Sequence, residues 1–420
     1  MPVPRTGHRP AVLLAYAAFV FVGVSAGVGG VLLPAQILDY QVDKAAIGTT
    51  FFTFSAGFLL AGITTGRLID RTGVRIALVV GGGAFVVAGL YTAVRPPFLA
   101  FVAVQVLAGY GIGVLESVLN AYLSELPGAA TLLNRLHAFF GVGALVGPAL
   151  AAWMLTRLPW TAVWLVLALA CLPLVVGFLT VYPARSAPAD AVPAAGTDVR
   201  PGDDTRPDGP GDVAGAHTRA VEGAGGGLLG AALRQPAVLF GALFLTVYVG
   251  LEVSVGNWAF SFLVDGHQQT AVLAGYTVSG YWLGLTVGRF VISPVATRLG
   301  LTPVGTVLGC LAGVAVSALL AWLAPTAALA SVGLVLLGFF LGPAFPTAMA
   351  LVPRLTSARL VPTAIGVMNG VSVIGGAALP WLAGVIAQHV GVWTLLPFVL
   401  ALALVQLAIW WPLTRRISAG

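Results

Sequence analysis

The feature that most constrains this chain is its succession of long apolar stretches. Twelve of them have about 20 mainly apolar residues, enough to cross a bilayer as a helix. They lie near 11–35, 49–69, 76–94, 97–123, 136–158, 160–183, 237–264, 270–294, 303–323, 326–350, 363–387 and 390–413. A lipid environment requires each backbone polar group to be bonded within the protein, as it is in a helix. The sequence therefore predicts an all-α membrane protein with twelve transmembrane helices.

The composition is typical of an integral membrane protein. Charged residues make up 8% of the chain and apolar residues 59%, and the mean hydropathy is +0.99. A soluble domain would carry about 25% charged residues. We therefore expect the protein to be embedded in a lipid bilayer, which is its main partner. We also expect the protein to be a monomer.

A change of composition at 184–235 divides the chain. This segment is rich in Pro, Gly and charged residues and has almost no large apolar side chains, so it cannot bury enough surface to fold. We interpret it as a disordered linker between a six-helix bundle at 1–183 and a second one at 236–420. The Arg71-Thr72-Gly73 turn recurs as Arg298-Leu299-Gly300, which indicates two pseudo-symmetric halves.

The placement of basic residues predicts the orientation in a cell membrane. With the N-terminus inside, Lys44, Arg95 and Arg157 fall outside. On the inner side lie Arg5, Arg9, Arg67, Arg71, Arg75, Arg135, Arg289, Arg298, Arg354, Arg359, Arg415 and Arg416. Because short cytoplasmic loops are enriched in basic residues, both termini and the linker are expected to be cytoplasmic. The net charge of +6 then reflects topology, and we expect no nucleic-acid partner.

Two carboxylates, Glu116 and Glu252, lie deep inside apolar stretches. An acidic side chain at the bilayer centre costs roughly 2.5–3.5 kcal/mol, so it normally faces a cavity or the protein interior. No Lys or Arg is expected at comparable depth, since Arg289 is placed near a cytoplasmic end. Such a carboxylate can load and release a proton as its access alternates. The alternative is that one or both are merely protonated and hydrogen-bonded between helices.

Other polar or aromatic residues within the spans are candidates for a solute cavity. Asn120 lies four residues after Glu116, and Tyr248 four before Glu252, so each pair shares a helix face. Further candidates are His137, Asn257, Trp258 and Asn369. His137 could instead sit at the membrane interface, and Trp258 could belong to an aromatic belt.

The segment Gly66-Arg-Leu-Ile-Asp70-Arg71-Thr-Gly73-Val-Arg75 resembles the cytoplasmic signature of the major facilitator superfamily, Gly-x-x-x-Asp-Arg-x-Gly-x-Arg/Lys. The resemblance implies the twelve-helix fold of that family. It also implies that this gating motif, which includes Gly66 and Gly73, holds the halves together and gates the inner face through Asp70, Arg71 and Arg75. Positive-inside anchoring would explain the arginines equally well, although it does not account for Asp70.

A narrower resemblance is to the fucose permease-like branch, which contains sugar:proton symporters. It rests on four short matches in the same order: Leu115–Tyr122, Tyr248–Gly250, Gly288–Phe290 and Phe345–Thr347. In this family the first, fourth, seventh and tenth helices line the central cavity. An acidic residue of the first helix in that branch has Gly30 in its place here, and Glu252 is expected to compensate for it.

We therefore expect a secondary transporter, first of all a proton-coupled symporter of a sugar or similar polar solute. The alternative is proton-coupled efflux of a lipophilic, drug-like compound. A cavity dominated by Phe, Trp and Val would favour efflux, and one with convergent Asn, His, Glu and Tyr a polar solute. A membrane receptor is a third class, for which the chain offers no foldable signalling domain.

Enzymatic activity is not expected. The sequence has no Gly-x-x-x-x-Gly-Lys-Ser/Thr phosphate loop and no Cys/His spacing typical of a metal site. We expect no cofactor and no metal.

Overall fold

The computed structural model describes residues 8–183 and 228–418, and every regular element in these ranges is helical. Of the predicted linker, 184–227 lies outside the described residues. The part that is described includes a short helix at 228–233.

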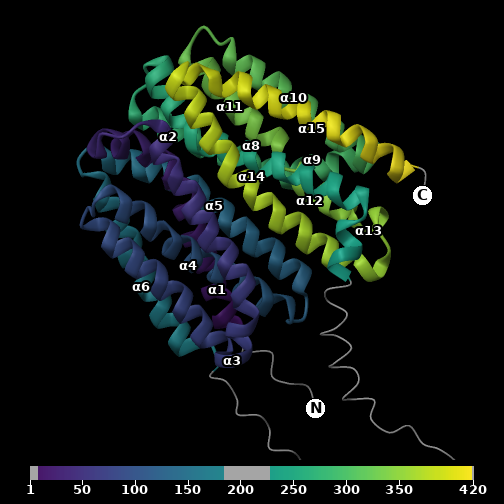
Figure 1. The fold of residues 1–420 in the computed structure, drawn as a ribbon, viewed down its shortest axis with the longest axis horizontal. Helices are drawn as coiled ribbons and strands as arrows, with labels where there is room; N and C mark the ends of the chain where they lie inside the picture. Colours follow the sequence, from purple (N-terminus) through teal and green to yellow (C-terminus); the bar gives the residue numbers. More distant parts are fainter. Residues whose placement is uncertain (1–7, 184–227, 419–420) are drawn as a thin grey trace, which may run out of the picture.

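Two bundles of helices lie side by side, one from each half of the chain (Figure 1). The first, purple to blue, consists of α1 (Arg9–Tyr40), α2 (Lys44–Ile47), α3 (Thr49–Ala93), α4 (Phe98–Ser124), α5 (Ala129–Leu155) and α6 (Trp160–Val181).

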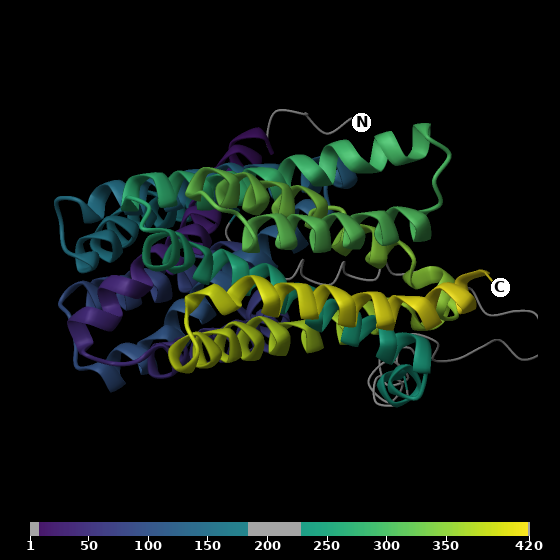
Figure 2. The ribbon, with the colours of Figure 1, turned by 90° about the horizontal axis from the view of Figure 1, so that it is seen from above.

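The second bundle, teal to yellow, begins after the linker. It consists of α8 (Pro236–Ser261), the π-helical turn η1 (Phe262–Gly266), α9 (Ala271–Arg298), α10 (Pro303–Trp322), α11 (Ala327–Leu341), α12 (Ala344–Ala350), α13 (Val352–Leu355), η2 (Ala358–Leu360), α14 (Val361–His389), η3 (Val392–Thr394) and α15 (Leu395–Ser418). The axes of most of its long helices are roughly parallel to one another (Figure 2).

The twelve predicted spans are confirmed as helices. Ten helical segments of the described chain are long and apolar enough to cross a membrane. One of these, 44–93, contains the second and third predicted spans, joined at Gly73, whose φ of 81° breaks the helix of α3. The eighth predicted span is α9, which is helical but is not among these ten segments. The tenth predicted span is formed by α11 together with α12.

Short-range signals set where several helices start. Asp43 accepts a hydrogen bond from the Ala46 amide at the start of α2, and Thr302 and Thr326 cap α10 and α11 in the same way. Proline occupies the first turn of α8, α10 and α14, where no amide hydrogen is needed.

The two bundles repeat the same helix pairing. In the first, α1 packs against α5, and α3 packs against both α4 and α6. In the second, α8 packs against α14, α9 against α11, and α10 against α15. Each pair of the first half thus has a counterpart in the second, and the pseudo-symmetry predicted from one short repeat extends over the whole fold.

Glycines bring the paired helices into backbone contact. A Cβ atom on Gly57 would overlap the carbonyl oxygen of Val106, and one on Gly109 would overlap that of Phe54, so α3 and α4 touch along their backbones. Gly288 of α9 approaches the Phe339 carbonyl of α11 in the corresponding pair. Since lipid supplies no hydrophobic drive for helix association, such close packing is what stabilises membrane bundles.

Hydrogen bonds join the two bundles at the end of the molecule that carries α2. There the Lys44 amide donates to Gln388 Oε1 (3.1 Å) and Trp381 Nε1 donates to the Ala45 carbonyl (3.2 Å). Farther along, α5 packs against α9, and the Ala149 amide donates to Ser279 Oγ (3.1 Å).

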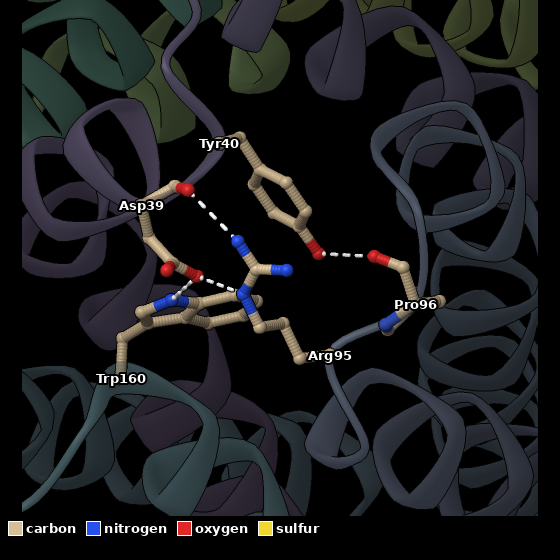
Figure 3. A network of polar contacts seen from close by, with 5 residues as sticks. All are labelled: Asp39, Tyr40, Arg95, Pro96 and Trp160. Atoms are coloured by element: carbon tan, nitrogen blue, oxygen red, sulfur yellow. Dashed lines mark hydrogen bonds and ion pairs between the residues drawn. The ribbon is translucent and has the colours of Figure 1, made fainter.

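A polar network fastens the α2 end of the first bundle (Figure 3). Asp39 Oδ2 at the end of α1 accepts hydrogen bonds from Arg95 Nε (2.7 Å) and Trp160 Nε1 (2.9 Å). The Arg95 guanidinium also donates to the Asp39 carbonyl (2.8 Å), and Tyr40 donates to the Pro96 carbonyl (2.9 Å). The network joins α1, the α3–α4 connection and the start of α6, and it holds Arg95 at a φ of 54°.

The glycine contacts give a test of the packing. We expect Gly57→Ala to lower stability by about 1–3 kcal/mol, because the added methyl group meets rigid backbone. Gly62→Ala on the same helix meets nothing within 4 Å and should leave stability unchanged or slightly higher. Thermal unfolding of the purified protein in detergent measures both, and equal midpoints would contradict the contact.

Candidate functional site

A cavity of about 340 Å³ lies at the centre of the molecule, between the two bundles. Most of its wall comes from α1, α3 and α4 of the first bundle, and α8, α9 and α14 contribute from the second. The lining residues are Val22, Ser25, Ala26, Val28, Gly29, Leu32, Leu33, Gln36, Thr50, Phe51, Phe54, Ser55, Phe58, Phe101, Gln105, Ile112, Glu116, Phe140, Trp164, Val249, Val253, Asn257, Trp282, Val373 and Gly376.

Helical periodicity explains which residues reach the cavity. On α4, Gln105, Ile112 and Glu116 are seven and four residues apart, so they share one face. On α8, Val249, Val253 and Asn257 follow one another at four-residue intervals and do the same.

Aromatic rings form a large part of the wall. They are Phe51, Phe54, Phe58, Phe101, Phe140, Trp164 and Trp282. Flat faces of this kind bind the apolar face of a ring-shaped solute.

Polar groups interrupt the apolar wall at a few places. Gln36 is 4% exposed, and its amide makes no hydrogen bond with another described residue. Gln105 donates only a long bond (3.4 Å) to the Phe101 carbonyl, which leaves its oxygen available. Asn257 donates to the Val253 carbonyl (2.9 Å) and also keeps its oxygen. These amides offer donors and acceptors to a solute with hydroxyl or carbonyl groups.

Glu116 is the one acidic residue in the cavity wall. Its carboxylate has no hydrogen-bond or ion-pair partner within 8–183 and 228–418. Asn120, on the next turn, donates to the backbone carbonyl of Glu116 (2.8 Å) and not to the carboxylate. An unpaired carboxylate in this setting avoids the cost of a bare charge by taking up a proton.

Glu252 has a different environment from the one predicted. The expectation that no cation lies at its depth is wrong, because Arg289 Nη2 of α9 is 3.6 Å from Glu252 Oε1. Arg289 Nε also donates to the Gly342 carbonyl (3.3 Å), and the Tyr281 hydroxyl donates to the Glu252 carbonyl (3.1 Å). Glu252 is absent from the cavity wall, so the two glutamates do not share one cavity in this conformation.

The prediction placed Arg289 too close to the cytoplasmic end, because it took the position of the residue along its helix as the depth of its charged group. Arg289 is nine residues from the end of α9, yet its long side chain reaches Glu252 in the neighbouring α8. The sequence did contain a signal for this pair. Opposite charges that lie inside the apolar stretches of consecutive spans are expected to pair with each other.

The other predicted cavity residues mostly lie elsewhere. Tyr248 is fully buried against Phe345, with a ring distance of 5.6 Å, and Trp258 Nε1 donates to the Pro380 carbonyl (2.7 Å) between α8 and α14. His137 is exposed and contacts the edge of Phe19, while Asn369 is exposed on α14. Of the predicted residues, the structure brings only Glu116 and Asn257 into the cavity wall.

Gln36 and Gln105 were missed by sequence reasoning. Gln105 is a polar residue inside a predicted span and lies on the Glu116 face of α4, so helical spacing from Glu116 was a usable signal for it. Gln36 lies one residue past the predicted span 11–35, in the part of α1 that extends to Tyr40.

The predicted gating motif lies around the break in α3. Gly73 supplies the positive φ of the turn, and a Cβ at Gly66 would meet open space. Arg75 Nε donates to the Tyr182 carbonyl (2.6 Å) at the end of α6, so this arginine fastens two helices of the same bundle. Asp70 has no hydrogen bond or ion pair to another described residue.

Across the described parts of the chain, no group of three or more His, Cys, Asp or Glu side chains could hold a metal ion. Cys171 and Cys310 are both buried free thiols, one in each bundle.

The Glu252–Arg289 pair makes a testable prediction. Glu252→Gln should lower stability by about 3 kcal/mol, the lower end for a broken buried pair because 30% of the Arg289 side chain is exposed. The double variant Glu252→Gln/Arg289→Gln should recover part of this loss, since no charge is left unpaired. Thermal unfolding measures the stability of each variant. If the two substitutions lowered stability by independent, additive amounts, the two side chains would not be coupled.

Comparison with family models matches the Major Facilitator Superfamily over residues 14–300 and 254–419. Among curated proteins, Bypass of stop codon protein 6 of Saccharomyces cerevisiae is 26% identical over 390 residues, which is 89% of this chain and 76% of the relative.

Two further relatives match over part of their length. A gallate transporter of Pseudomonas putida is 27% identical over 44% of this chain and 43% of the relative. A multidrug resistance protein of Salmonella typhi is 25% identical over 39% of this chain and 43% of the relative. This chain therefore matches less than half the length of these two proteins.

Solved structures share the fold at low sequence identity. A nucleoside transporter superposes with a TM-score of 0.73 at 12% identity, covering 97% of this chain and 100% of the other. The fucose:proton symporter of E. coli gives 0.62 at 15% identity, covering 98% and 99%.

Proposed function

The chain belongs to the major facilitator superfamily of membrane transporters, and from that premise we propose that it couples the movement of a small ring-shaped polar solute to protons. The family resemblance predicted from Gly66–Arg75 is confirmed, and the protein is a transporter and not an enzyme. The observation that carries the proposal is the unpaired Glu116 carboxylate in the wall of the central cavity.

Glu116 couples the proton to conformational change through the cost of a bare charge. When the cavity is closed to both sides, an unpaired carboxylate inside it lacks water and costs several kcal/mol. A protonated carboxyl removes most of that cost, so the closed state forms readily only after protonation. Alternating access of the two bundles then moves the proton together with the solute.

The solute class follows from the mixture of rings and amides. Aromatic faces suit the apolar face of a ring, and Gln36, Gln105 and Asn257 suit its hydroxyl groups. A sugar meets both requirements and is the first candidate, with other hydroxylated rings next. Similar proteins are named as transporters of fucose, nucleosides and gallate, all of which are rings with polar substituents.

Proton-coupled efflux of a lipophilic compound is the second candidate. The seven aromatic residues of the wall favour it, and a similar protein is described as a multidrug resistance protein. The two candidates differ in how much the cavity amides contribute to affinity.

Several features follow as parts of the same proposal. Both termini and the 184–235 linker are placed in the cytoplasm of a multi-pass cell-membrane monomer by the arginine asymmetry. The two transporting units are 1–183 and 236–420. Asp70, Arg71 and Arg75 gate the cytoplasmic end, and the Glu252–Arg289 pair stabilises the second bundle.

A proton-coupling test uses Glu116→Gln in proteoliposomes. The variant should lose at least tenfold of its pH-gradient-driven sugar accumulation, because an amide cannot exchange a proton. It should still exchange labelled for unlabelled solute at equilibrium. Glu125→Gln in the exposed α4–α5 connection is the matched control. Undiminished accumulation by Glu116→Gln would falsify the coupling.

A solute test uses Gln36→Ala. Loss of one hydrogen bond of about 1 kcal/mol should weaken binding of a polar solute about fivefold. Gln268→Ala, at a site outside the cavity, should leave binding unchanged. Binding of labelled sugars and lipophilic dyes measures both. Unaltered affinity for every sugar, together with dye extrusion, would support the efflux candidate.

A further inference from the structure

A second cavity, of about 730 Å³, lies at the end of the first bundle opposite α2. The first turns of α1, the α4–α5 connection and the first turns of α5 enclose it. Its lining residues are His8, Arg9, Val12, Leu13, Tyr16, Leu126, Pro127, Gly128, Leu132 and Arg135.

This cavity is separate from the solute cavity. Leu13 lies nine residues before Val22, which is about two and a half helical turns, so the two side chains leave opposite sides of α1. The two cavities share no lining residue.

The charge of the second cavity is entirely basic. Arg9 and Arg135 contribute two guanidinium groups, and the His8 ring lies 3.3 Å from the Tyr122 hydroxyl. No acidic residue lines the cavity, and neither arginine has a hydrogen bond or ion pair within the described chain. Two unneutralised cations facing one space favour an anionic occupant.

The rest of the wall is apolar and includes one unsatisfied hydroxyl. Val12, Leu126 and Leu132 surround the basic groups, and Leu13 is 67% exposed. Tyr16 is only 7% exposed, and its hydroxyl has no hydrogen-bond partner among the described residues. A site that combines cations, a spare hydroxyl and apolar side chains at the end of membrane-spanning helices matches an amphipathic anion.

We propose that this cavity binds the headgroup of an anionic phospholipid. The phosphodiester lies between Arg9 and Arg135, and the adjoining acyl chain follows Val12 and Leu13 toward the hydrocarbon region. Basic pockets between membrane helices bind anionic headgroups through the same pairing of charge with an apolar wall. The proposal is independent of what the central cavity transports.

The test measures lipid retention by the purified full-length protein. Detergent-solubilised protein is incubated with equal amounts of phosphatidylglycerol and phosphatidylcholine, and bound lipid is counted by native mass spectrometry. Wild type should retain phosphatidylglycerol selectively. Each of Arg9→Gln and Arg135→Gln should weaken retention about fivefold, and the double variant about 20-fold.

Arg359→Gln, in the exposed turn η2 of the second bundle, is the control and should retain lipid like wild type. Thermal unfolding identifies any variant that fails to fold, and Arg9→Lys, which keeps the charge, should restore most of the retention. Equal retention by wild type and the double variant would overturn the proposal. Displacement of the lipid by millimolar inorganic phosphate would also overturn it, because the site would then select a free anion.

Discussion

Backbone contact between paired helices is the interaction on which the rest of this structure depends. Glycines on α3, α4 and α9 let neighbouring helices touch without intervening side chains, and the same pairing recurs in both bundles. Because lipid competes with side chains for apolar contact, close approach supplies the dispersion energy that association needs. The tight pairs leave space along the axis between the bundles, and the central cavity occupies that space.

The two membrane-embedded glutamates show how a protein manages a carboxylate away from water. Arg289 lies 3.6 Å from the Glu252 carboxylate, so the charge of Glu252 is compensated in place. Glu116 has no such partner among the described residues and lies in the wall of the central cavity. The same residue type is thus found in two environments, which differ in whether an opposite charge lies within reach.

Fold and site differ in how far the sequence predicts them. The twelve spans follow from apolar length alone, although the second and third are separated only by the break in α3 at Gly73, whose φ is 81°. Glu116 and Asn257 were found as cavity residues because polar side chains inside a span are costly and therefore informative. Trp258 and Tyr248 carried the same signal but are used for packing between helices. Helix rotation and the reach of long side chains, as in Arg289, depend on neighbours far apart in the sequence, and local pattern does not encode them.

The neutrality of the Glu252–Arg289 pair has a consequence for energy supply. A compensated pair that stays intact adds no net charge to the moving parts, so an electric field across the membrane exerts little net force on it. In the proposed coupling, a proton carried at Glu116 would still experience that field, at about 2.3 kcal/mol for each charge per 100 mV. With an uncharged solute the proposed cycle would be electrogenic. Membrane voltage would then add to the proton concentration gradient, and a symporter coupled in this way would continue to accumulate solute when the two sides have the same pH.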